Sequence, residues 1–109
     1  MESAAGLIKL VPNARSDLEA WRAALASRPD EVMQSLRAEG VAVEAWFRIE
    51  VNQEPYLLWF MRARSIAQAM EIFLASTRDI DVLHLEMMTK LAASQIDAEL
   101  LLDFGADTV

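Results

Sequence analysis

The sequence predicts an α+β domain, a four-stranded antiparallel sheet with helices on one face. Residues 41–63, VAVEAWFRIEVNQEPYLLWFMRA, form two apolar stretches joined by a short polar turn, and the first stretch alternates with the period of a strand. Stretches with the helical spacing of apolar residues flank this hairpin, and a further strand is expected near each end. At 109 residues, the whole chain (1–109) is expected to form one domain.

Composition argues against several classes of protein. The chain has no cysteine, so we expect neither disulfides nor thiolate metal sites, and this suits the reducing cytoplasm. Its net charge of −7 argues against nucleic-acid binding, which usually needs a basic surface. The first residues, MESAAGLIKLV, lack the features of a signal peptide, and no segment approaches a membrane span in length. We therefore expect a cytoplasmic protein without nucleic-acid or membrane partners.

The first strand and the first helical region are predicted from local signals. A strand is expected at 5–11, where the next residue is Pro12. The sequence SDLE at 16–19 has the spacing of a capping box, in which the serine hydroxyl caps the start of a helix. Pro29 interrupts the helical pattern, so we expect a kink or a restart there, because proline is tolerated in a first turn. Gly40 is well placed to end the second segment.

The two strands of the hairpin differ in their faces. The face expected to pack on the helices carries Val43, Phe47 and Ile49, and the opposite face carries Glu44, Trp46 and Arg48. The second strand, 56–63, is apolar on both faces, so both of them need covering. The turn around NQE, residues 52–54, leaves the register open. A two-residue turn places Leu57, Trp59 and Met61 on the face of Trp46, and a three-residue turn places Leu58 and Phe60 there.

The second half repeats the strand and helix pattern. Ser65 is the expected N-cap of a helix whose apolar face carries Ile66, Met70, Phe73 and Leu74. After a break at 77–79, a further helix carries Ile80, Leu83, Met87 and Leu91 on one face. A last strand is expected at 96–104, followed by a frayed tail at 105–109.

The resulting order is β-α-β-β-α-β with each helical region split in two. Two right-handed crossovers placed side by side give the ferredoxin-like arrangement, in which helices cover only one face of the sheet. The other face must then be solvated, bind a ligand or pair with another protein, and an apolar face of this kind usually marks an interaction site.

Three motifs resemble a small bacterial family of uncharacterised proteins within the dimeric α/β-barrel superfamily. They are EVMQSLRAEGVAVEAW at 31–46, YLLWF at 56–60 and IDVLH at 80–84. The resemblance covers roughly residues 5–93. It implies a ferredoxin-like fold, a homodimer with two sheets face to face across a dyad, and a pocket between the sheet and the helices of each subunit. The family has no established reaction, so the resemblance implies no activity.

His84 is the one histidine of the chain, and the spacing of Asp81 and His84 puts both side chains on one helical face. In one interpretation the pair is catalytic: the carboxylate orients the imidazole and raises its pKa, and His84 transfers protons. In the other, Asp81 starts a helix and His84 is a hydrogen-bonded packing residue. One histidine without cysteine is a poor metal site, so no metal and no cofactor are expected.

A second set of candidates lies on the hairpin. Tryptophan, arginine and glutamate together suit either a planar or anionic small molecule or a dimer interface. This set, a ligand or dimer face, consists of Glu44, Trp46, Arg48, Trp59 and Met61.

Two functions follow from these patterns. The first is a small cytoplasmic protein of uncharacterised activity that forms a face-to-face homodimer and binds a small molecule beside the sheet. The alternative is an enzyme acting on a small molecule, resembling the cofactor-free monooxygenases of the superfamily, with His84 transferring a proton.

Overall fold

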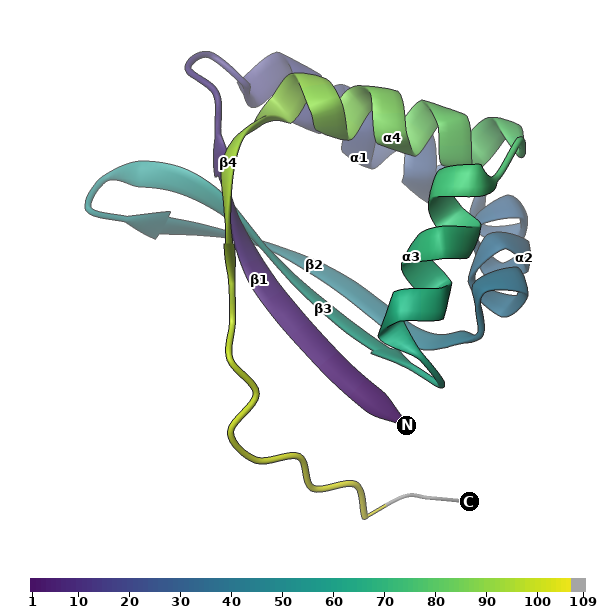
Figure 1. Cartoon of the computed structure of the whole chain (residues 1–109). Helices are drawn as coiled ribbons and strands as arrows, with labels where there is room; N and C mark the ends of the chain where they lie inside the picture. The colour runs from purple at the N-terminus through teal and green to yellow at the C-terminus, as the bar shows by residue number, and fades with distance from the viewer. Residues whose placement is uncertain (107–109) are drawn as a thin grey trace.

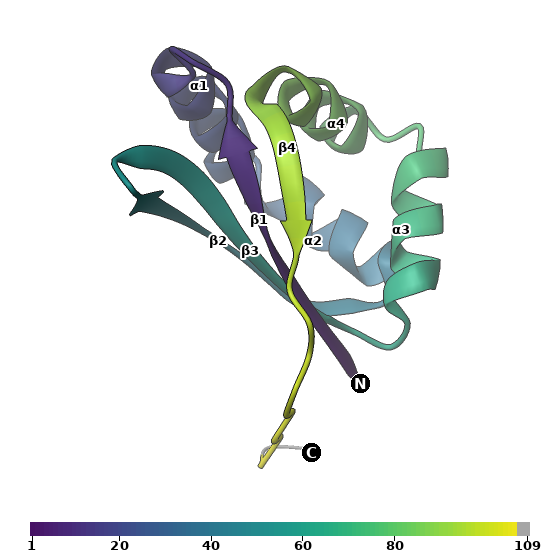
Figure 2. The same ribbon diagram turned by 60° about the vertical axis from the view of Figure 1, so that its left-hand side comes forward.

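The computed structural model describes residues 1–106 and has eight elements of regular structure (Figure 1). In chain order these are β1 (Glu2–Leu10), α1 (Arg15–Ala26), α2 (Pro29–Glu39), β2 (Val41–Val51), β3 (Glu54–Ala63), α3 (Ile66–Ala75), α4 (Asp79–Leu91) and β4 (Ala92–Asp97). The strands form one antiparallel sheet in the order β2-β3-β1-β4. The helices lie on one side of it (Figures 1 and 2), which confirms the predicted ferredoxin-like α+β fold.

Local signals placed most of the helix ends correctly. Helix α2 begins at Pro29, so the proline marks a restart. Gly40 ends it in the left-handed conformation with φ of 74°, which glycine adopts without steric cost. Ser65 caps α3 by accepting a hydrogen bond from the backbone N–H of Gln68 at 3.2 Å.

The predicted capping box at 16–19 is wrong. Helix α1 begins at Arg15, its N-cap is Ala14, and no side chain caps it. The carbonyl of Ala14 accepts the N–H of Leu18, which places the serine at 16 already inside the first turn. Ala14 is only 5% exposed, so its packing in the core decides where the helix starts.

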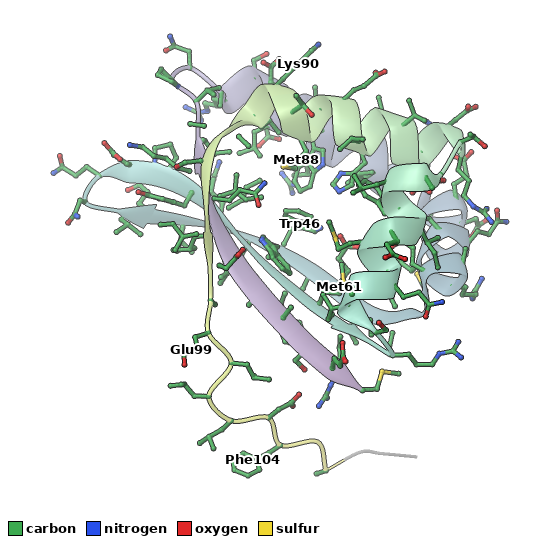
Figure 3. All side chains as sticks on the ribbon, in the orientation of Figure 1. Trp46, Met61, Met88, Lys90, Glu99 and Phe104 are labelled. Atoms are coloured by element: carbon green, nitrogen blue, oxygen red, sulfur yellow. The ribbon has the colours of Figure 1, made fainter. Side chains whose placement is uncertain are left out.

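The predicted last strand at 96–104 is also wrong in its bounds. Strand β4 ends at Asp97, opposite Gly6, and after it the N–H of Ala98 bonds to the carbonyl of Ala5. Residues 98–106 then leave the sheet without regular structure (Figure 3), and the run Leu100, Leu101 and Leu102 breaks the alternation that a strand would need. Of the tail expected at 105–109, residues 107–109 lie outside the described part of the chain.

The hairpin turn contains two residues. Asn52 and Gln53 have φ of 53° and 67°, and positive φ at both central positions is what a type I′ hairpin requires. The register pairs Glu44 with Met61, Trp46 with Trp59, and Arg48 with Leu57. The two-residue alternative is therefore confirmed, and these side chains share one face.

The prediction of which hairpin face meets the helices is wrong. The register of β2 shifts between Val41 and Val43, so a bulge at Ala42 reverses the alternation after it. Val41 is buried, whereas Val43 and Phe47 are 45% and 52% exposed on the face away from the helices. The face with Glu44, Trp46 and Arg48 lies toward the helices.

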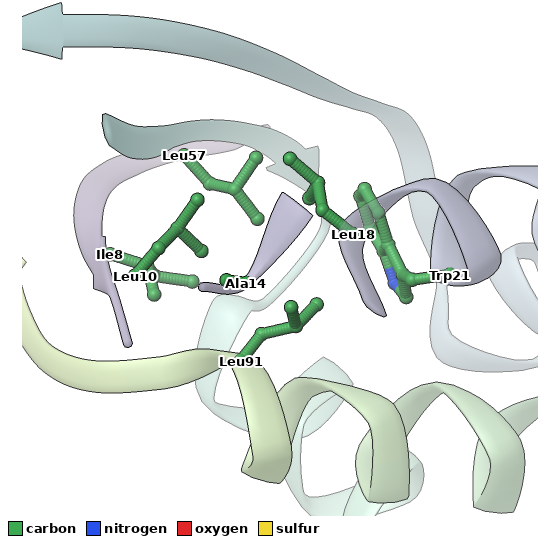
Figure 4. Packing of buried hydrophobic residues seen from close by; sticks show 7 residues of the cluster. All are labelled: Ile8, Leu10, Ala14, Leu18, Trp21, Leu57 and Leu91. Atoms are coloured by element: carbon green, nitrogen blue, oxygen red, sulfur yellow. The ribbon is translucent and has the colours of Figure 1, made fainter. Parts of the chain in front are cut away.

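Two apolar clusters join the sheet to the helices. The larger lies between β1, β3, α1 and the end of α4 (Figure 4) and consists of Ile8, Leu10, Ala14, Leu18, Trp21, Leu57 and Leu91. The smaller consists of Val41, Met61, Ala63 and Ala69. Trp59 packs against both clusters, so this side chain joins them across the inner face of the sheet.

Candidate functional site

A cavity of about 920 Å³ lies between the inner face of the sheet and the helices. Trp46, Met61 and Met88 point into this space from β2, β3 and α4 (Figure 3). Its aromatic lining is Trp21, Trp46, Phe47, Trp59, Phe73 and His84. Its polar lining includes the buried side chains of Ser35, Glu39 and Asp81 and the half-buried side chain of Glu44. The cavity therefore combines a wide apolar wall with a small group of acidic side chains.

Three aromatic rings from three other elements surround His84 of α4. Its ring stacks on Trp21 with centroids 6.0 Å apart, while Trp46 and Phe73 approach it edge-on at 5.6 and 5.5 Å. Trp21 and Trp46 are themselves nearly perpendicular, with centroids 5.2 Å apart. Edge-to-face contacts of this kind are favourable beyond the area they bury, and they hold the rings in fixed orientations.

The hydrogen bond between Trp21 and His84 fixes the tautomer of the histidine. Trp21 Nε1–H donates to His84 Nδ1 at 2.8 Å. An indole N–H can only donate, so Nδ1 carries the lone pair and Nε2 carries the proton of the neutral ring. Burial lowers the pKa of His84 and outweighs the opposing effect of Asp81, so the neutral form is favoured. The raised pKa expected from the Asp81 pair is therefore wrong in sign.

Asp81 is held by serines instead of by the histidine. Ser35 Oγ and Ser76 Oγ lie 2.5 Å from its two carboxyl oxygens, and Ser35 Oγ also lies 2.8 Å from Glu39 Oε2. Ser35 has one proton to donate, so it cannot donate to both carboxylates at once. Both contacts are satisfied when one carboxyl is protonated and donates to the serine.

Glu39 is the carboxyl most suited to hold that proton. It exposes only 7% of its surface, and its pKa is raised to about 7, first by burial and then by the nearby charges of Asp81 and Glu44. The hydrogen bond with Ser35 and the charge of Arg78 act in the opposite direction. Glu39 therefore titrates near neutral pH.

Glu44 is the carboxyl that reaches the cavity from the sheet. Its Oε1 accepts a hydrogen bond from Trp46 Nε1 at 3.1 Å, two residues along the same face of β2. Burial raises its pKa, and the hydrogen bond with Trp46 lowers it by less. Within residues 1–106, its other oxygen, Oε2, accepts no hydrogen bond from the protein.

The position of the Trp59 side chain depends on Gly6 of β1. Gly6 pairs with Trp59 in the sheet, and a Cβ at this position would lie 2.8 Å from Trp59 Nε1. Such a contact is shorter than side chains tolerate, so any larger residue would move the indole. The glycine therefore lets Trp59 lie flat over the neighbouring strand.

All the residues that sequence patterns singled out line this one cavity. They are Asp81, His84, Glu44, Trp46, Arg48, Trp59 and Met61. Sequence reasoning missed Trp21, Ser35 and Glu39. One sequence signal could have singled out Glu39: it is an acidic residue in the last turn of a helix, where the helix dipole disfavours negative charge. In residues 1–106 no group of three or more His, Cys, Asp or Glu side chains is arranged to hold a metal ion.

The chain belongs to a family of unknown function, DUF6176, whose model matches residues 1–108. This confirms the prediction of an uncharacterised family. No curated protein matches the sequence. In residues 1–106, none of the helices is long and apolar enough to cross a membrane.

Solved structures share the fold at low sequence identity. An L-rhamnose mutarotase from Formosa agariphila has a TM-score of 0.58 and 16% identity, over 96% of this chain and 100% of the other. Protein Atu4242 from Agrobacterium tumefaciens has a TM-score of 0.55 and 12% identity, over 90% and 89%. Rv0793 from Mycobacterium tuberculosis has a TM-score of 0.54 and 19% identity, over 94% and 97%. Identities in this range support a common fold alone.

Proposed function

We propose that this chain, a member of a family without an assigned activity, binds an apolar or aromatic small molecule in its cavity and acts as a homodimer. The observation that carries the binding proposal is the cavity of about 920 Å³, which falls within the usual size of small-molecule sites, roughly 300–1,000 Å³. The cavity is partly open to solvent, so a ligand can enter it from outside. A cytoplasmic location is part of the proposal, as the cysteine-free composition suggests.

The lining favours an apolar or aromatic ligand over a sugar. One protein of similar fold is named as an L-rhamnose mutarotase, which suggests that this architecture suits small-molecule sites. A sugar needs hydrogen-bond partners around most of its surface, however, and this cavity is walled largely by Trp, Phe, Met and Leu side chains. Its polar groups that are not exposed are few: His84, Ser35 and the acidic cluster of Glu39, Glu44 and Asp81.

The alternative function is an enzyme that transfers a proton, as the cofactor-free monooxygenases of similar fold suggested. The observation that favours it is the presence of both His84 and Glu44 in the lining of one largely apolar cavity. Since His84 Nδ1 accepts from Trp21, Nε2–H is a donor, and the imidazole in this tautomer suits stabilising a developing oxyanion. Glu44, with a pKa raised by burial, suits the role of base.

Binding can be tested with a library of aromatic fragments, using saturation-transfer NMR. Met70 lines the cavity from α3 and is 45% exposed, so Met70→Trp should narrow the opening without changing the core. Gln68→Trp adds the same side chain at an exposed position of α3 outside the lining. We expect fragments to bind the wild type and the Gln68 variant, and at least tenfold more weakly to the Met70 variant. Absence of wild-type binding, or equal binding by both variants, would refute the proposal.

The homodimer is proposed through the sheet face away from the helices. An apolar row crosses all four strands there: Phe47 pairs with Leu58, Leu58 with Leu7, and Leu7 with Ile96. Phe47 and Ile96, at the two ends of the row, are 52% and 55% exposed. A contiguous apolar face of this kind usually marks an interface. Pairing of two copies through this face covers the outer sheet face of each subunit.

The segment after β4 extends this apolar surface. Leu100, Leu101, Leu102 and Phe104 are between 57% and 86% exposed. The segment is tied to the same face of β3 by an ion pair between Arg62 and Asp103 at 2.8 Å. Apolar side chains held outward in this way suit contact with a partner subunit.

Light scattering after gel filtration tests the dimer. Phe47→Glu puts a charge at the apolar row, and Val82→Glu is the matched control, because Val82 is 41% exposed on α4. We expect dimers at ~50 µM for the wild type and the control, and monomers for the Phe47 variant, because an unpaired charge is costly to bury. A monomeric wild type, or a dimeric Phe47 variant, would overturn this part of the proposal.

A further inference from the structure

We propose that the ligand of the cavity is an organic cation, an aromatic or apolar body carrying an ammonium group that binds beside Glu44 and Trp46. This inference rests on the proposed binding function and adds the charge of the ligand to it. Three features of the cavity support a cation: the acidic side chains in its lining, the carboxylate oxygen of Glu44 that accepts no hydrogen bond from the protein, and the aromatic side chains of the same lining.

Within residues 1–106, the charged side chains of the lining that are not exposed are acidic. Glu39 and Asp81 are buried and Glu44 is half-buried, and they come from α2, α4 and β2. The arginines in the lining, Arg22 and Arg48, are exposed. An anionic ligand in the interior would therefore meet repulsion from buried carboxylates, whereas a cation would meet attraction that low polarity strengthens.

Without a ligand, the negative charges of Glu39, Glu44 and Asp81 have little positive charge near them. Burial and mutual repulsion raise the pKa of Glu39 to about 7 and also raise the pKa of Glu44. Only Arg78, which lies outside the lining, lowers the pKa of Glu39 through its charge. A bound cation would supply the missing positive charge among these groups, which is what an opposite charge does for a buried carboxylate.

The free carboxylate oxygen lies beside an aromatic wall. The hydrogen bond from Trp46 Nε1 to Glu44 Oε1 holds the carboxylate against the edge of the indole, and within residues 1–106 Oε2 has no donor. An ammonium group paired with Oε2 would lie within the aromatic lining of the cavity, and the faces of aromatic rings attract a cation most strongly when it is desolvated.

The aromatic rings also accommodate the apolar part of the ligand. Trp21, Trp59 and Phe73 line the cavity from α1, β3 and α3. Their arrangement leaves an aryl or alkyl body in contact with rings on several sides. A carboxylate beside indole rings is therefore a complementary site for an arylalkylammonium ion, with its charge at Glu44 and its ring in the apolar part.

Isothermal titration calorimetry at pH 7 tests the charge with three probes of similar size. They are 2-phenylethylammonium, 2-phenylethanol and 3-phenylpropanoate. Glu44→Gln removes the charge and keeps the shape of the side chain. Glu50→Gln is the matched control, because Glu50 is exposed on the same strand and does not line the cavity.

We expect the ammonium to bind the wild type at least tenfold more tightly than the alcohol or the carboxylate. Glu44→Gln should remove that preference while it leaves the affinity for the alcohol within about twofold, and Glu50→Gln should change neither. The cation proposal would be refuted if the alcohol or the carboxylate binds as tightly as the ammonium or more tightly, or if the ammonium preference survives Glu44→Gln. Either result would still support small-molecule binding in the cavity. If none of the three probes binds, the cation proposal is refuted, and the fragment screen with the Met70 and Gln68 variants decides the binding function separately.

Discussion

Replacement of Glu39 by Gln should make the stability of this protein less sensitive to pH. Glu39 lies among Ser35, Asp81 and Glu44, with Arg78 as the nearest opposing charge, and its pKa is raised from 4.5 to about 7. In the unfolded chain the carboxyl ionises from about pH 4.5, whereas the folded protein keeps it protonated until about pH 7. The free energy of unfolding of the wild type should therefore fall as pH rises across that window and level off above it.

The size of the effect follows from the same values. One pKa unit corresponds to about 1.4 kcal/mol, so the rise to about 7 corresponds to at most about 3 kcal/mol, and nearer 2 kcal/mol if water in the cavity screens the charge. Gln cannot ionise, and its amide can still donate to Ser35 Oγ. We expect Glu39→Gln to match the wild type near pH 4.5 and to be about 2–3 kcal/mol more stable at pH 8.5.

Urea unfolding followed by tryptophan fluorescence measures this difference at both pH values. All samples should have one protein concentration, because unfolding of a dimer depends on it. Glu86→Gln, at an exposed position of α4, is the control for loss of a carboxylate as such. Equal stabilities of Glu39→Gln and wild type at pH 8.5, or a parallel loss of stability in both from pH 5 to 8.5, would show that the reasoning is wrong.

Three further changes test the packing. Gly6→Ala should displace Trp59, shift the wavelength of tryptophan emission and lower the free energy of unfolding in urea by about 1–3 kcal/mol. An unchanged spectrum and an unchanged stability would contradict the close contact between Gly6 and Trp59. Leu91→Ala empties a fully buried position and should cost about 2–5 kcal/mol, where a loss below 1 kcal/mol would mean that the site collapses freely. Ser65→Ala should cost about 1 kcal/mol through loss of the α3 cap, and Ser65→Asp should retain most of it.

Sequence patterns predicted most of the fold because its elements carry local signals. Proline at 29, glycine at 40 and serine at 65 each act through the backbone conformation or hydrogen bond of their own residue, so their effect depends little on distant parts of the chain. The order of strands and helices then left few topologies, and the ferredoxin-like one is observed. The serine at 16 failed as a cap because packing of Ala14 into the core started the helix earlier.

The hairpin shows where alternation alone is insufficient. The extra residue at the bulge near Ala42 turns each later side chain of β2 to the opposite face of the sheet. No residue type at this position is specific for a bulge, so the sequence does not predict it. Trp46 and Phe47 thus exchanged roles: the first lies over the cavity and the second faces away from the helices. The candidate residues of the hairpin were grouped correctly, because a shift of register moves a whole face together.

The sequence by itself determined the elements, their order, the family and the set of residues on one hairpin face, because these depend on neighbours in the chain. Only the tertiary structure decided which face of the sheet the helices cover. It also decided that Trp21 sets the tautomer of His84 and that Glu39 and Ser35 lie beside Asp81 in the cavity. Ser35 and Asp81 are 46 positions apart and Trp21 and His84 are 63 apart, so their meeting depends on the packing of helices on the sheet. The hairpin thus supplies the tryptophan and the carboxylate, and the helices supply the charges and rings around them.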